Sequence, residues 1–286
     1  MPPASSTERC ADLSQAAGEP LTATAITART WLVLEVPGAW SRDVSAEDAL
    51  PGEARAAVDA WLAKTPGGRL QFVRRPGRTL RSLLAFVVRA DEATQELRRL
   101  EIGRLEDLAA VDLSQAGERV THPLVLVCGH GTRDQCCALR GTAVFAALAE
   151  GLGEDELWLS SHQGGHRFAA NVLVLPAGLQ FGRVEPAEAP LLVARALAGR
   201  IELGRYRGRT CYEPGAQAAE HAVREAAGLD GVDDLRLDAA ENGVVRFRGF
   251  DGSTWAAVVE EGLGPSVPAS CAAEPEPQRT LGARLL

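Results

Sequence analysis

Three of the six cysteines in this chain, Cys128, Cys136 and Cys137, lie within ten residues of one another. The first of them ends an apolar run, residues 123–128, whose length and composition are typical of a buried strand. A polar loop that contains glycine separates it from the other two. In a long chain with no predicted secretory leader, such cysteines are more often metal ligands, catalytic groups or small buried side chains than disulfides.

A pair of histidines follows the next predicted strand. Residues 138–152 have helical spacing, residues 156–160 have the composition of a strand, and His162 and His166 lie in the loop after it. A helix that crosses between two strands predicts that the strands are parallel. Both loops would then leave the same edge of one sheet, so we expect two thiols and two imidazoles to meet there.

Two thiolates and two imidazoles can saturate either a tetrahedral zinc ion or the two irons of a [2Fe–2S] cluster. The eight residues between Cys128 and Cys137 are a wide spacing for a structural zinc knuckle. Gln163 stands where the metalloprotease motif has its glutamate, which argues against a hydrolytic zinc site. Nearby glycines would let backbone N–H groups approach a cluster closely.

The segments CGHGTRDQCCALRG and SSHQGGHRFAANVLVLPAGLQFGRV carry a resemblance to a known family. They resemble the sucrase/ferredoxin-like family, a branch of the thioredoxin-like [2Fe–2S] ferredoxins. The resemblance is dense over about residues 122–185 and looser elsewhere. It implies that Cys128 and Cys137 hold one iron and that His162 and His166 hold the other.

The neighbouring residues are assigned supporting roles by the same reasoning. Cys136 is an alternative to Cys137, because the two are adjacent and the sequence does not say which points inward. His130, Arg133, Gly165 and Arg167 are expected around the ligands rather than on the metal; for Arg167 a plain salt bridge is an equal alternative.

Histidine ligation would have a chemical consequence. Neutral imidazoles in place of thiolates make the cluster less negative and raise its potential. A ligated imidazole can also lose its second ring proton, so electron uptake and proton uptake are expected to be coupled. The potential should then fall as pH rises.

The predicted fold class is α/β, more specifically α+β, with three segments. Residues 1–115 form an N-terminal α/β region, with strands at 30–36, 70–73 and 82–88 and helices at 51–63 and within 96–110. Residues 116–205 form the thioredoxin-like ferredoxin domain. Residues 206–286 form a helix at 215–227, a small β-meander over 235–259 and a proline-rich tail that wraps the surface. Residues 1–27 are expected to be a partly wrapped arm.

Composition limits the location and the partners. The formal net charge of −8 argues against a dedicated nucleic-acid-binding protein. Apolar runs are far shorter than the roughly 20 residues that cross a bilayer, and residues 1–14 lack the apolar core of a signal peptide. We therefore expect a cytoplasmic protein without a membrane partner. Cys10, Cys211 and Cys271 are expected to be structural or incidental.

The predicted function is one-electron transfer. The sequence has no GxGxxG dinucleotide fingerprint, so the electrons are expected to come from a redox partner protein. The chain would then be a carrier or redox module rather than a self-contained catalyst. Two alternatives stay open: a zinc-binding structural or interaction protein with the same ligands, and a thioredoxin-type thiol enzyme, although the C-x-x-C signature is lacking.

Overall fold

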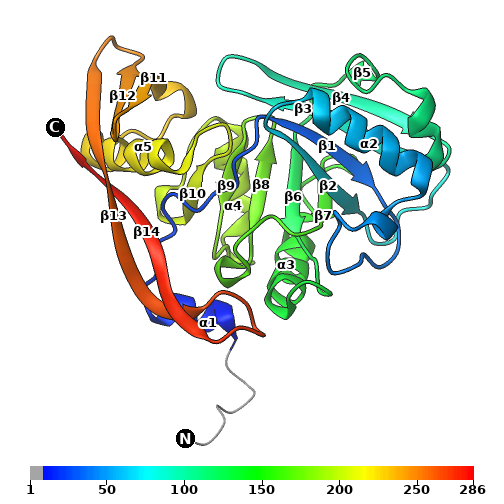
Figure 1. Cartoon of the computed structure of the whole chain (residues 1–286), viewed down its shortest axis with the longest axis horizontal. Coiled ribbons are helices and arrows are strands. Elements are labelled where there is room, and N and C mark those ends of the chain that lie inside the picture. Colours follow the sequence, from blue (N-terminus) through cyan, green and yellow to red (C-terminus); the bar gives the residue numbers. More distant parts are fainter. Residues whose placement is uncertain (1–8) are drawn as a thin grey trace, which may run out of the picture.

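The computed structural model describes residues 9–286 and contains five α-helices and two β-sheets (Figure 1). The helices are α1 (Cys10–Ala16), α2 (Gly52–Lys64), α3 (Gln135–Leu148), α4 (Ala189–Leu197) and α5 (Pro214–Ala227). The strands of the large sheet are β1 (Thr30–Glu35), β2 (Gly68–Arg74), β3 (Leu83–Ala90), β4 (Gln95–Ile102), β5 (Glu118–Arg119), β6 (Leu124–Cys128), β7 (Leu157–Ser160), β8 (Val172–Leu175), β9 (Leu179–Phe181) and β10 (Tyr206–Arg209). The strands of the small sheet are β11 (Leu235–Glu241), β12 (Val244–Gly249), β13 (Thr254–Pro268) and β14 (Pro275–Leu285).

The large sheet has ten strands in the order β10-β9-β8-β6-β7-β2-β1-β3-β4-β5. Its centre is a strand–helix–strand unit, in which α3 connects the parallel strands β6 and β7. The antiparallel hairpin β8–β9 extends the sheet on the other side of β6, and α4 follows it. The predicted parallel pair and the mixed α+β class are therefore confirmed, and the strand order β7-β6-β8-β9 is the thioredoxin-like order expected from the sequence.

Hydrogen bonding continues from this unit into both flanking regions. Strand β2 of the N-terminal region pairs with β7 through Val73 and Arg74, and β10 pairs with β9. Each of the three predicted segments thus contributes at least one strand to the same sheet. The site at the end of β6 and β7 is consequently supported on both sides by strands from distant parts of the sequence.

Helices cover the two halves of the sheet separately. Helix α2 packs on β1, β2 and β3 through Ala54, Val58 and Trp61. Helices α3 and α4 pack on β6, β8 and β9, with Val144 of α3 and Leu192 of α4 in one buried cluster. A third cluster joins side chains of both halves on the remaining side of the strands. Among the described residues, no helix combines the length and the apolar character that crossing a bilayer requires.

The C-terminal region differs in part from the prediction. Helix α5 and strands β11 to β13 are present as expected, but residues 262–286 are not a surface wrap. Strands β13 and β14 form a long antiparallel hairpin, whose tip lies beside α1 in Figure 1. Beyond Val259, β13 pairs only with β14, so its prolines lie in a two-stranded ribbon, where a missing N–H is tolerated.

Two further predictions were inexact. The segment 96–110 was expected to begin as helix, but its first part, up to Ile102, belongs to β4, which pairs with β3 along its whole length. Its charged residues misled the helical prediction, because Glu96 forms an ion pair with Arg119 of the neighbouring strand β5 and Arg99 forms one with Glu118. The N-terminal arm contains α1 from Cys10 onward, and positions 1–8 lie outside the described residues.

Candidate metal centre

Three of the four predicted ligands lie together at the edge of the large sheet. Cys128 is the last residue of β6, Cys137 lies in the first turn of α3, and His162 follows β7. Their potential ligand atoms all lie within 4.8 Å of one another. The ring of His166 stacks on the ring of His162, with centroids 4.1 Å apart and planes 20° apart. The fourth residue is therefore adjacent to His162.

The two adjacent cysteines at the start of α3 point to different places. Neighbouring residues on a helix project about 100° apart. Cys137 approaches Cys128 and His162, whereas the Cys136 sulfur lies 3.6 Å from that of Cys10 and 3.3 Å from that of Cys271. The sequence had left Cys136 and Cys137 as alternatives, and in this structure only Cys137 belongs to the group around His162.

The two thiols of this group share a hydrogen bond. Donation from the Cys137 thiol, supported by His162, holds the pKa of Cys128 well below its ordinary value despite complete burial. The same hydrogen bond and burial raise the pKa of Cys137. The two thiols thus titrate as a coupled pair, which favours one shared proton and one thiolate. A thiolate is the form that binds a metal.

Both imidazoles have a ring nitrogen without a partner. Within the described part of the chain, Nδ1 of His162 and Nδ1 of His166 are buried and form no hydrogen bond. Burial, and then the neighbouring His162, lowers the pKa of His166 to about 4. His166 is therefore neutral near pH 7, which is the form that binds a metal. Buried nitrogens left unpaired are costly unless something binds them.

His130 has both ring nitrogens engaged. Its Nε2 donates to the carbonyl of Ser41 at 2.9 Å, and its Nδ1 accepts from the backbone N–H of His162 at 3.2 Å. These two contacts select one neutral tautomer of the ring. Burial also lowers the pKa of His130, which favours the neutral form. His130 thus positions the start of the histidine loop through the hydrogen bond from the His162 backbone N–H.

The histidine loop depends on its two glycines. Gly164 and Gly165 have φ of +78° and +66°, a region that side chains other than glycine adopt rarely. A Cβ on Gly165 would lie 2.7 Å from Phe168 and 2.8 Å from Arg207. The turn that carries His162 and His166 toward each other therefore needs glycine both for its backbone angle and for space.

Sequence reasoning missed the buried polar side chains under this loop. Arg207 of β10 is fully buried and donates to the carbonyl of Gly164 at 3.0 Å and to Oδ1 of Asn171 at 2.7 Å. Gln163 donates to the carbonyl of Leu126 and to Ser160 Oγ, both at 2.8 Å. The sequence contains only a weak indication of these positions, which is the occurrence of polar residues in or beside apolar segments.

The two arginines predicted near the ligands face other groups. Arg167 forms an ion pair with Glu19, at 2.7 Å, and Glu19 is almost fully buried. Arg133 reaches the carbonyl of Arg42 at 3.5 Å, at the outer limit for a hydrogen bond. The salt-bridge reading of Arg167 therefore describes its contact in the structure.

Comparison with known proteins bears on this arrangement. A family model described as sucrase/ferredoxin-like matches residues 21–208, a span that includes all four predicted ligands. The chain belongs to the sucrase/ferredoxin-like family. The resemblance noted in the two loops is therefore confirmed for most of the chain.

Curated relatives in this family carry the name altered inheritance of mitochondria protein 32. The protein of that name from Eremothecium gossypii is 32% identical over 146 residues, which cover 46% of each chain. Those from Meyerozyma guilliermondii and Saccharomyces cerevisiae are 27% and 28% identical, over 38% and 48% of this chain and 42% and 45% of theirs. The matched region spans less than half the length of these relatives. No solved structure matches.

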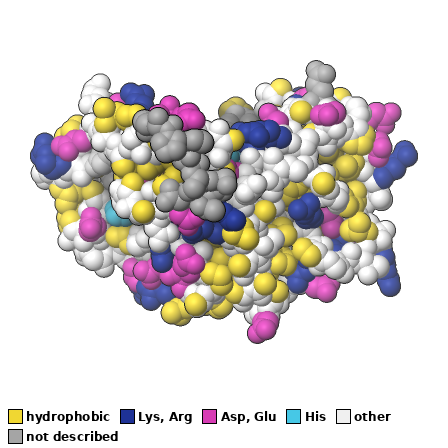
Figure 2. Space-filling view, turned by 90° about the horizontal axis from the view of Figure 1, so that it is seen from below, with side chains coloured by type: hydrophobic (Ala, Val, Ile, Leu, Met, Phe, Trp, Pro, Cys, Tyr) yellow, Lys and Arg dark blue, Asp and Glu magenta, His cyan; other side chains and the backbone are white. Residues whose placement is uncertain are grey.

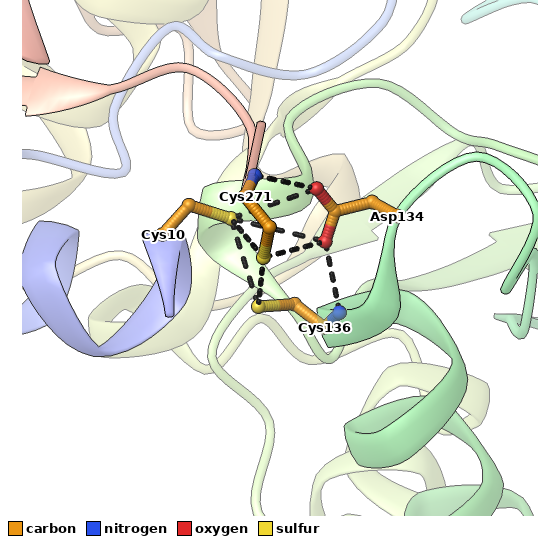
Figure 3. A group of neighbouring side chains, drawn as sticks. All are labelled: Cys10, Asp134, Cys136 and Cys271. Carbon is orange, nitrogen blue, oxygen red and sulfur yellow. Dashed lines mark hydrogen bonds between the residues drawn. The ribbon is translucent and has the colours of Figure 1, made fainter. Parts of the chain in front are cut away.

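A second group of potential ligands was not predicted. Cys10, Cys136 and Cys271 converge with Asp134, and their potential ligand atoms lie within 4.8 Å of one another (Figure 3). Cys10 and Cys271 had been interpreted as structural or incidental. They are 126 and 135 residues away from Cys136 in sequence, so no spacing motif could have joined them.

Proposed function

We propose that this protein is a one-electron carrier with a [2Fe–2S] cluster held by Cys128, Cys137, His162 and His166. The observation that carries the proposal is the combination of two buried thiols with two imidazoles whose buried Nδ1 atoms have no partner among the described residues. Membership of the sucrase/ferredoxin-like family supports the same donor set. When bound, such a cluster supplies reversible uptake of a single electron.

The residues of the chain would hold the cluster as two unlike pairs. Cys128 and Cys137 approach each other through a shared hydrogen bond, so both sulfurs can turn to one iron. His162 and His166 lie in one stacked pair and would face the other iron. His130 and the glycine loop fix the position of the histidine pair. Coupling of electron and proton uptake at these imidazoles stays a prediction of this ligand set.

A tetrahedral zinc site is the second candidate, because it has a specific observation in its favour. The ligand atoms of Cys128, Cys137 and His162 lie within 4.8 Å of one another, a spacing that a single ion also satisfies. A thioredoxin-type thiol enzyme is supported less, since Cys128 and Cys137 are fully buried and therefore shielded from a protein substrate.

Spectroscopy of variants tests the proposal. The purified full-length protein should be red-brown and contain iron and sulfide, and dithionite should give one reduced [2Fe–2S] signal in electron paramagnetic resonance. Cys137→Ser should abolish or strongly alter that signal. Cys211→Ser, at a buried cysteine outside both groups of potential ligands, should leave it unchanged as the control. His166→Cys should retain a cluster with shifted g values and a lower potential, because a thiolate adds negative charge.

If the purified protein is colourless and contains stoichiometric zinc that is lost in Cys137→Ser, the site binds zinc and the proposed cluster is wrong. Full thiol activity after His162→Ala and His166→Ala would instead favour the thiol enzyme.

An electron carrier also needs a partner protein, and the surface offers charges for such contacts. Figure 2 shows acidic and basic side chains interspersed on one face of the molecule. The cytoplasmic location expected from the sequence is checked by cell fractionation.

A further inference from the structure

The group formed by Cys10, Asp134, Cys136 and Cys271 brings together three separate parts of the fold. Cys10 begins α1, Asp134 and Cys136 flank the start of α3, and Cys271 lies in the turn between β13 and β14. Figure 3 shows the three sulfurs and the carboxylate pointing toward a common centre. Cys10 and Cys136 are buried, whereas Cys271 is exposed to solvent.

The distances match those around one tetrahedral ion. The sulfur of Cys136 lies 3.6 Å from that of Cys10 and 3.3 Å from that of Cys271, and the third separation is 3.6 Å. Two thiolates that share an ion at about 2.3 Å are about 3.8 Å apart. Sulfurs that bind different irons of a cluster lie farther apart than sulfurs that share one ion. The group is therefore the right size for a single ion.

The carboxylate of Asp134 completes the donor set. Its Oδ1 lies 3.3 Å from the Cys271 sulfur and 3.9 Å from that of Cys10, and sulfur and oxygen on one zinc ion are about 3.6 Å apart. The backbone N–H of Cys136 donates to Oδ1 at 2.8 Å, and the backbone N–H of Cys271 donates to Oδ2 at 2.9 Å. Such outer hydrogen bonds orient a carboxylate that ligates a metal.

We propose that Cys10, Cys136, Cys271 and Asp134 form a second, mononuclear site for a divalent ion with the preferences of zinc. Three soft sulfurs and one carboxylate oxygen suit zinc, and each thiol releases its proton as it binds. The site is distinct from the group around His162, because Cys136 and Cys137 project from α3 in different directions. This proposal does not depend on the cluster.

The surroundings favour the charge of such a site. Three thiolates and a carboxylate around a divalent ion leave a net negative charge. Asp134 caps the N-terminus of α3, whose unpaired N–H groups favour nearby negative charge. The hollow next to Asp134 and Cys271 is also lined by Arg9, Arg42 and Arg133. These guanidinium groups lie on the side from which solvent reaches the site.

The ion would fasten α1 and the tip of the β13–β14 hairpin to the central unit. Without it, α1 is held to α3 by the ion pair of Asp12 with Arg140 and by thiol contacts. The hairpin tip is then held by the hydrogen bond from the Cys271 backbone N–H to Asp134. With it, metal bonds hold both elements to Cys136, which is adjacent in sequence to Cys137. The site would thereby fix the first turn of the helix that also presents Cys137.

Metal analysis of full-length variants tests the proposal. Protein purified under reducing conditions with added zinc should contain one zinc ion per chain that persists in Cys128→Ser. Cys271→Ser, at an exposed position, and Cys10→Ser should each lower zinc affinity at least about 100-fold, since even outer partners are worth about 10–100-fold. Cys211→Ser, at a buried free cysteine outside both groups, should keep the zinc.

Cobalt substitution provides a second readout that does not depend on yield. Co²⁺ should give thiolate charge-transfer bands and intense tetrahedral d–d bands in the Cys128→Ser background, and Cys271→Ser should remove them. Unchanged zinc content and cobalt spectra in both Cys10→Ser and Cys271→Ser would overturn the proposal. So would a disulfide between Cys136 and Cys271 in freshly purified, zinc-saturated protein. Neither result would affect the iron signal that tests the proposed cluster.

Discussion

Gly141 of α3 lies directly against the carbonyl oxygen of Cys128. A Cβ built on Gly141 would be 1.9 Å from that oxygen, far inside any permitted contact. Cys137 lies four residues earlier on the same helix, and residues at this spacing share a face. The contact that glycine permits therefore sets how closely the Cys137 thiol approaches the Cys128 thiol.

We expect Gly141→Ala to disrupt the candidate centre. Alanine favours helix by about 1 kcal/mol over glycine, but here its methyl group would push α3 away from the end of β6. The expected net result is a loss of about 1–3 kcal/mol in the free energy of unfolding and a lower iron content per chain. Urea denaturation and iron analysis measure the two effects.

Gly151→Ala is the matched control. Gly151 follows α3, has no atom within 4 Å of a built Cβ and has no positive φ. It should leave both stability and iron content close to those of the wild type. Equal iron content in Gly141→Ala and Gly151→Ala would show that the approach of α3 to Cys128 does not control the site.

The sequence predicted the central unit better than its surroundings. Apolar segments separated by one helical segment sufficed for the parallel pair β6 and β7, because short-range patterns determine that unit. Strand β4 was missed because its apolar positions, such as Leu97, are few and some of its charges lie in cross-strand ion pairs, such as that of Glu96 with Arg119. The hairpin of β13 and β14 was missed because of its prolines. Proline is tolerated in a strand where its missing N–H faces no neighbouring strand, and the sequence does not show which side of a strand is paired.

The two metal-ligating groups illustrate the same limit. Cys128 and Cys137 are close in sequence, and His162 follows a strand adjacent to that of Cys128, so topology alone brings them near one another. Cys10 and Cys271 meet Cys136 only because α1 and a long hairpin fold back on α3. That approach depends on packing between distant segments, for which no local pattern exists in the sequence.

Arg207 is expected to support the histidine loop. It is fully buried and forms hydrogen bonds with Gly164, Asn171 and Thr24, including one to Thr24 Oγ1 at 3.0 Å. Lysine keeps the charge but lacks the planar set of donors, so Arg207→Lys leaves buried acceptors unpaired. We expect a loss of about 1–3 kcal/mol in stability and a weaker cluster signal.

Arg248→Lys serves as the comparison for this substitution. Arg248 pairs with Asp238 on the surface, with 63% of its side chain exposed, and exposed pairs contribute little. Its free energy of unfolding should change by less than about 0.5 kcal/mol. If Arg207→Lys behaved like Arg248→Lys in denaturation and spectroscopy, Arg207 would have no role in holding the loop.

A buried ion pair fastens α5 to β10. Arg224 donates from Nε to Glu220 at 3.0 Å and from Nη1 to the carbonyl of Gly231 at 2.7 Å, and Tyr206 donates to Glu220 at 3.0 Å. Both charged side chains are fully buried. We expect Arg224→Met to cost about 3–5 kcal/mol, because it leaves the Glu220 carboxylate buried without its partner.

Replacing both partners should cost less than the two single substitutions together. The double variant Glu220→Gln with Arg224→Met removes both charges, so no lone buried charge remains. A double-mutant cycle from urea denaturation measures this coupling. Strictly additive effects would mean that the pair contributes nothing beyond its separate side chains.

His221 on α5 should make stability depend on pH. Burial lowers its pKa below the ordinary value, against the opposing influence of Glu225 and Glu220 and of its contact with the Leu203 backbone, while Arg224 lowers it further. The folded protein therefore binds a proton at His221 less readily than the unfolded chain does. Above the ordinary value of about 6.5 both states are neutral, and no stability is lost there.

As the pH falls below about 6.5, the unfolded chain is protonated first and the folded state loses stability through the window down to its lower pKa. The wild type should thus lose more stability than His221→Gln between about pH 7.5 and about pH 5.5. Comparing the two proteins cancels the acid sensitivity of the metal-ligating groups, which both retain. A parallel decrease in urea denaturation, or an NMR titration of His221 above pH 6.5, would contradict the assignment.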